Sequence, residues 1–121
     1  MSDTKTFLAV FTGSQGSGKF AAWNALPEAE RKKREQQGMA AWNAWVQKHQ
    51  GAIVEMGGPL GKTKQIASGG ITDIRNNLSA FTVVRAESHE AAAAMFKEHP
   101  HFAIFPGESV EVMPILPIPG R

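Results

Sequence analysis

Residues 6–11 have the sequence Thr6-Phe7-Leu8-Ala9-Val10-Phe11. Successive side chains of a β-strand point to opposite faces of its sheet, so Phe7, Ala9 and Phe11 share one face while Leu8 and Val10 share the other. A strand that is apolar on both faces is typical of the centre of a sheet. We therefore expect these residues to form a central strand with both faces covered.

The rest of the chain adds two helical segments and further strands around this one. In chain order, we expect a strand at 6–11, a Gly/Ser loop at 12–19, a helix at 27–50, a strand at 52–56, hairpin-like pieces within 62–78, a strand at 80–86, a helix at 88–99 and a strand at 109–113. Pro27 suits the first turn of the long helix and Gly51 its end. Ser88 is a good N-cap for the second helix, and Pro100 should close it.

This order, β-α-β-β-α-β, predicts an α+β fold of the ferredoxin-like type in one domain covering residues 1–121. Residues 114–121 contain three prolines and should form an extended tail. Two helices can cover only one face of a four-stranded sheet, so the face with Leu8 and Val10 needs another cover. Large exposed apolar patches are uncommon on monomers, which predicts a homodimer.

Composition limits the possible functions. The chain is 42% hydrophobic and 20% charged, which is ordinary for a globular domain, and its formal net charge is only +2. The four cations at 31–34 lie between carboxylates, so nucleic-acid binding is not expected. The absence of cysteine excludes disulfides and thiolate catalysis, and no apolar run is long enough to span a membrane. The cytoplasm is the expected location.

Several segments together resemble the YCII-related protein family. They are Met39-Ala40-Ala41-Trp42-Asn43-Ala44-Trp45, Gly57-Gly58-Pro59-Leu60-Gly61, His99-Pro100-His101 and Gly107-Glu108-Ser109-Val110-Glu111-Val112-Met113-Pro114. The resemblance implies a ferredoxin-like domain that dimerises into a dimeric α/β barrel, and acid-base chemistry on small organic molecules through a helical histidine paired with an aspartate. This sequence departs from that pattern, because Ala41-Trp42 stands at the histidine position and no aspartate lies near Gly58-Pro59.

Residues 13–20 match the phosphate-loop pattern G-x-x-x-x-G-K-[ST] except at the last position, which is Phe20. Phenylalanine cannot replace the hydroxyl that ligates magnesium in such loops. A flexible Gly/Ser connection is the favoured interpretation, and nucleotide or phosphate binding at residues 13–20 is the alternative. We expect no cofactor.

The candidate catalytic residues are His99 and Glu55. His99 ends an apolar stripe on its helix, so its imidazole should be buried with a lowered pKa and could act as a general base, or it could be a helix-end histidine satisfied by a backbone group. Glu55 shares its side of the strand with Ile53 and could be a buried acid or base, or a solvated residue if the strand is at an edge.

The candidate ligand-binding residues are Trp42, Trp45 and His101. The tryptophans could form a flat wall for an apolar ligand or simply fill the core. His99 and His101 are two residues apart with no third ligand nearby, which is a poor signal for a zinc site, so we expect no metal. The sequence thus indicates a homodimer that binds a small organic molecule in the cleft of the dimeric barrel, with or without metal-free acid-base chemistry. The alternative is a non-catalytic dimeric module that senses a metabolite or assists a regulatory partner.

Overall fold

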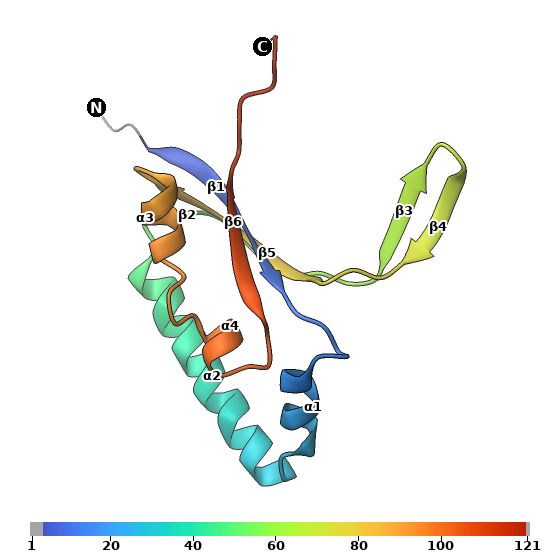
Figure 1. Cartoon of the computed structure of the whole chain (residues 1–121). Helices are drawn as coiled ribbons and strands as arrows, with labels where there is room; N and C mark the ends of the chain where they lie inside the picture. Colours follow the sequence, from blue (N-terminus) through green and yellow to red (C-terminus); the bar gives the residue numbers. More distant parts are fainter. Residues whose placement is uncertain (1–3, 121) are drawn as a thin grey trace.

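The structure, a computed structural model that describes residues 4–120, contains a four-stranded antiparallel sheet with its helices on one side (Figure 1). The strands are β1 (Lys5–Thr12), β2 (Ile53–Pro59), β5 (Leu78–Ala86) and β6 (Ser109–Pro114). They lie in the order β2-β5-β1-β6, and every neighbouring pair is antiparallel. This is the split β-α-β topology of ferredoxin-like folds, and it confirms the predicted α+β class.

β1 lies inside the sheet between β5 and β6, as predicted. The face of β1 toward the helices carries Phe7, Ala9 and Phe11, each at most 1% exposed. Phe7 lies opposite Val84 of β5 and packs in one core cluster with Phe96. Because these side chains are buried together, the core lies between the sheet and the helices.

The segment before the long helix differs from the prediction. We expected a loop at 12–19 and one helix at 27–50, but a short helix α1 (Gly18–Ala25) precedes the long helix α2 (Glu28–Lys48). Ser17 starts α1, because its hydroxyl accepts a hydrogen bond from the N–H of Phe20 across 3.1 Å. The glycine-rich composition favoured a loop, so the N-cap role of Ser17 was not predicted.

The second helical region is divided in two. Ser88 caps α3 (His89–Ala94) as predicted, by accepting a hydrogen bond from the N–H of Ala91. α3 ends six residues before Pro100, and Glu98 adopts the left-handed region with φ of 56°. Pro100 then begins α4 (Pro100–Ala103) rather than closing a helix, because the φ of proline suits a first helical turn.

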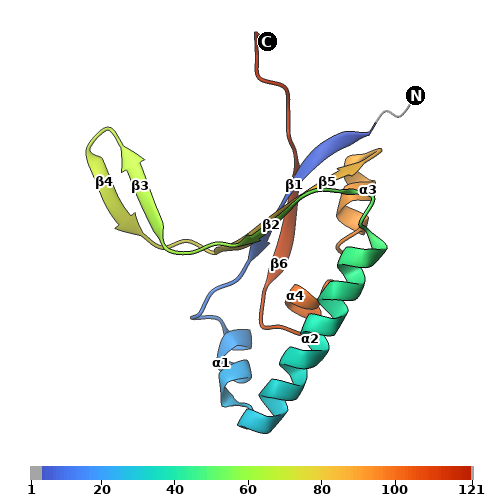
Figure 2. The same cartoon turned by 180° about the vertical axis from the view of Figure 1, so that it is seen from behind.

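The hairpin predicted within 62–78 is present as β3 (Thr63–Ala67) and β4 (Gly70–Ile74). It forms a separate two-stranded sheet that projects from the body on the side away from the helices (Figures 1 and 2). Lys64 and Asp73 form an ion pair across it at 2.7 Å. Its facing pair Ile66 and Ile71 remains 73% and 66% exposed, so the hairpin buries little of its own apolar surface.

The second face of the sheet, here called the open face, carries Leu8 and Val10 of β1 beside Phe81 and Val83 of β5. The helices of the described chain all lie on the other side (Figures 1 and 2). An apolar face without a helical cover is thus a property of the single chain. Among residues 4–120, no helix combines the length and apolar character needed to cross a membrane.

Candidate functional site

His99 is the most enclosed polar residue of the helix-covered face. Its side chain is 0% exposed, which confirms the predicted burial. The rings of Trp42, Trp45 and Phe11 meet it nearly edge to face, with centroids 4.6, 4.9 and 5.0 Å away. Phe96 packs beside it at 5.9 Å. We call these four residues the aromatic cage.

Hydrogen bonds fix the tautomers of both histidines. Nδ1 of His99 accepts a bond from the backbone N–H of His101 across 3.0 Å, so the ring proton of neutral His99 is on Nε2. That Nε2 is fully buried and has no hydrogen-bond partner. The Nε2 of His101 lies 2.7 Å from the carbonyl oxygen of Thr12, which can only accept, so His101 also carries its proton on Nε2.

Burial, with smaller contributions from His101 and His49, lowers the pKa of His99 from 6.5 to about 4. Burial also lowers the pKa of His101, and Lys19 adds to this effect while the bond to Thr12 opposes it. Both imidazoles are therefore neutral at pH 7. Neutral His99 nevertheless has no free lone pair, because Nδ1 is occupied and Nε2 is protonated.

The two tryptophans on α2 hold the cage in place. Trp45 is 9% exposed and its indole N–H donates to the carbonyl of Met95 across 2.7 Å. Trp42 is half-buried and stacks on Phe11 at 5.4 Å with an interplanar angle of 20°. The structure thus brings together four of the five sequence-derived candidates: Trp42, Trp45, His99 and His101.

Glu55 lies elsewhere, and the expectation that it shares a side with Ile53 is wrong. Ile53 pairs with Val84 and Glu55 with Val83, which are neighbouring residues of β5 that point to opposite faces. The pairing of β2 with β5 contains one extra residue at Val54. The side chains of β2 that follow it therefore point to the opposite face from the one that strict alternation predicts. Glu55 is exposed on the open face, at an edge strand, and accepts a hydrogen bond from the N–H of Gly57. The sheet separates it from His99.

Gly107 is required by the position of His101. A Cβ at this position would lie 2.3 Å from Nε2 of His101 and 2.5 Å from its carbonyl oxygen. The N–H of Gly107 donates to that same oxygen across 2.9 Å. Only glycine allows this close approach of the chain to the imidazole, and the sequence alone gave no sign of it.

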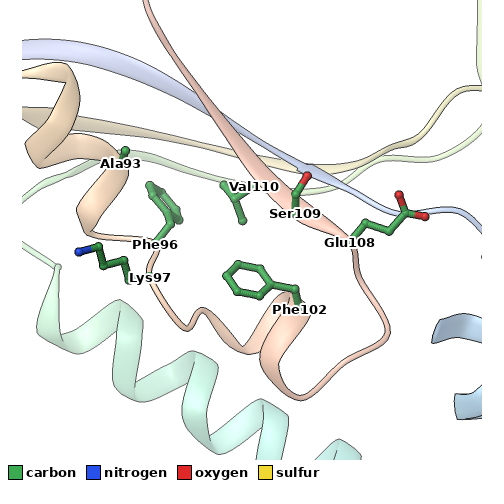
Figure 3. A pocket seen from close by; sticks show the side chains of 7 residues that line it. All are labelled: Ala93, Phe96, Lys97, Phe102, Glu108, Ser109 and Val110. Carbon is green, nitrogen blue, oxygen red and sulfur yellow. The ribbon is translucent and has the colours of Figure 1, made fainter.

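A hollow of about 340 Å³ lies between α3, α4 and β6, and Phe96, which packs beside His99, is one of its lining residues. We call it the β6 hollow. Figure 3 shows its apolar walls, Phe96, Phe102 and Val110, with Lys97 and Glu108 at opposite ends and Ser109 near Glu108. His99 does not line this hollow. The sequence did not identify Phe102 as a candidate binding residue, because it lies outside any periodic apolar pattern.

The segment at 13–20 is not arranged around a phosphate. The hydroxyl of Ser14 accepts from the N–H of Gly16, and Ser17 caps α1. The ammonium of Lys19 donates to the carbonyl of Phe102 on α4, at 2.7 Å, rather than turning toward the loop. Within residues 4–120, no group of three or more His, Asp or Glu side chains is placed to hold a metal ion.

No protein-family profile matches this chain, and no curated protein sequence matches it either. Among solved structures, the chain is similar to the 5-chloro-2-hydroxyhydroquinone dehydrochlorinase TftG from Burkholderia phenoliruptrix AC1100, in complex with 2,5-dihydroxybenzoquinone. The sequences are 19% identical, the alignment covers 88% of this chain and 89% of that one, and the TM-score is 0.49.

Proposed function

We propose that this protein is a YCII-like, homodimeric binding module that takes a small organic molecule into the β6 hollow. The observation that carries the proposal is the lining of the hollow. Phe96, Phe102 and Val110 offer apolar contact, and Lys97 and Glu108 lie at the two ends of the hollow with their charged groups directed outward (Figure 3). A volume of about 340 Å³ is at the lower end of ordinary ligand sites, which suits a molecule of one or two rings.

The closed aromatic cage favours binding over acid-base catalysis. A general base needs a lone pair within hydrogen-bond reach of a substrate proton. His99 offers none while Nδ1 is bonded to the N–H of His101, and its ring is 0% exposed. His99 and Glu55 also lie on opposite faces of the sheet.

One observation favours a second candidate function, hydrogen-bond donation by His99 to a bound molecule. A buried N–H without a partner is rare in folded proteins, and Nε2 of His99 is such a group. If Phe96 moved aside, this N–H could donate to a molecule in the β6 hollow, with Trp42, Trp45 and His101 around it. His99 would then act as a donor and not as a base.

The dimer is proposed from the open face. In the single chain Leu8, Phe81 and Val83 are half-buried and Val10 is 9% exposed, and together they form an apolar surface on which no helix packs. A second copy supplies an equal surface with twofold symmetry. Packing of two such faces would form the dimeric α/β barrel. Glu55 would then lie at the edge of the space between the two sheets.

Binding to the β6 hollow is tested with a library of one- and two-ring polar aromatic compounds, screened by thermal shift and confirmed by calorimetry. Ala93→Trp should fill the hollow from α3 and abolish binding, because Ala93 lines it and is exposed. Ala94→Trp is the matched control, since Ala94 is also exposed on α3 but does not line the hollow. Compounds that bind the Ala93→Trp variant and the parent equally would contradict the proposal.

A further inference from the structure

A second hollow, of about 320 Å³, lies between α1, α2 and the segment that follows α4. We call it the α1 hollow. Its aromatic lining residues are Trp23, Phe102 and Phe105, and its charged ones are Lys19 and Arg34. Two cations and no carboxylate line it, whereas the β6 hollow contains one charge of each sign.

The walls of the α1 hollow are held by specific contacts. Phe105 packs directly on α2 at Gly38, where a Cβ would lie 2.5 Å from its ring. Glycine within a helix costs about 1 kcal/mol relative to alanine, so this contact explains its presence there. Trp23 of α1 packs against Phe105, with ring centroids 5.8 Å apart. The bond from Lys19 to the carbonyl of Phe102 ties α1 to α4.

Both cations can take part in binding. The Lys19 ammonium has three N–H donors, and one hydrogen bond, to Phe102, uses only one of them. Among the residues that the structure describes, Arg34 makes no ion pair or side-chain hydrogen bond, although Glu30 lies one helical turn before it. The guanidinium of Arg34 therefore keeps the planar pair of donors that binds a carboxylate in bidentate geometry.

From these contacts we propose that the α1 hollow binds a small aromatic carboxylate. The ring lies against Trp23, Leu26 and Phe105, and the carboxylate lies between Lys19 and Arg34. Inorganic phosphate would satisfy the cations but leave the aromatic wall uncovered, and a neutral aromatic would leave the cations without a partner. A molecule with both features matches the whole lining.

This site is separate from the β6 hollow. The two hollows share one lining residue, Phe102 of α4. Binding to the α1 hollow therefore does not depend on the proposed function, and variants at Ala22 or Arg34 leave the lining of the β6 hollow unchanged.

The test is titration of the full chain with benzoate, followed by NMR shifts of the Trp23 indole. We expect Arg34→Gln to weaken benzoate binding about tenfold, as expected for loss of a charge-assisted contact. Lys33→Gln is the matched control, because it removes one positive charge from the preceding position of α2, which does not line the hollow. It should change the affinity for benzoate less than about twofold.

Filling the α1 hollow with a larger side chain is an independent test of benzoate binding. Ala22→Trp should abolish benzoate binding because Ala22 lines the α1 hollow, while Ala21→Trp, at an exposed neighbour on α1, should retain it. Thermal melting verifies that each variant folds. Benzoate binding that is unchanged in both Arg34→Gln and Ala22→Trp overturns the proposal. Equal affinity for inorganic phosphate or benzyl alcohol overturns the assignment to aromatic carboxylates.

Discussion

The backbone N–H of His101 donates a hydrogen bond to Nδ1 of His99 across 3.0 Å, inside the aromatic cage. The side chain of His99 thereby caps α4, and its second nitrogen, Nε2, remains buried without a partner. A charged imidazole would have to place a second proton on the capped nitrogen and would break this bond. The folded state therefore strongly favours neutral His99.

Stability should fall as the pH is lowered through the histidine range. The pKa of His99 is about 4 in the folded chain and 6.5 in the unfolded chain, so the unfolded state binds the proton first. The free energy of unfolding should be highest above about pH 6.5 and should drop by roughly 3 kcal/mol as the pH approaches 4. The lowered pKa values of His49 and His101 act in the same direction.

Urea unfolding at about pH 7 and about pH 5 measures this effect. His99→Asn keeps an oxygen that can accept the N–H of His101 but removes the titrating ring, so its stability should depend less on pH. An identical pH slope in the parent and the variant would show that His99 is not the main titrating group.

Gly107→Ala should destabilise the fold, because its Cβ would meet both Nε2 and the carbonyl oxygen of His101 within 2.5 Å. We expect a loss of about 1–3 kcal/mol in the free energy of unfolding. Gly61→Ala is the control, since nothing lies within 4 Å of its Cβ position, and its effect should stay within about 0.5 kcal/mol. Equal stability of the two variants in urea would refute the requirement for glycine at position 107.

If the open face is the dimer interface, a charged side chain placed on it should prevent dimerisation. Val83 lies in the middle of that face, opposite Leu8 of β1, so Val83→Lys should convert the dimer to a folded monomer in light scattering. Met39→Lys is the control, because Met39 is 56% exposed on α2, on the other side of the sheet, and should leave the dimer intact. A parent chain that is monomeric at micromolar concentration, with an ordinary melting transition, would remove the basis for the barrel.

Residues 13–20 should not support ATP hydrolysis. Phe20 stands where a phosphate loop has its magnesium-binding hydroxyl, and the ammonium of Lys19 is bonded to α4. We expect no magnesium-dependent release of phosphate from ATP by the purified chain. Turnover that disappears in Lys19→Ala would instead identify the segment as a phosphate site.

Local patterns in the sequence were sufficient to predict the order of the main helices and strands. Apolar side chains on both faces of residues 6–11 predicted the central strand, and Ser88 predicted the start of α3. These features depend on the two-residue period of a strand and on a serine that bonds to a nearby N–H, both of which act over a few residues. The capping by Ser17 is equally local, but the surrounding glycines made a loop the simpler interpretation.

The sequence alone thus determined the α+β class, the central place of residues 6–11 and the burial of His99. Only the tertiary structure decided how the candidate residues meet. One inserted residue at Val54 moved Glu55 to the open face, because each strand position that is gained or lost reverses the side-chain direction. The contact of His101 with Thr12 decided the tautomer of His101, and the contact of Phe105 with Gly38 decided a wall of the α1 hollow. Such contacts depend on packing between elements, which no local pattern of residues specifies.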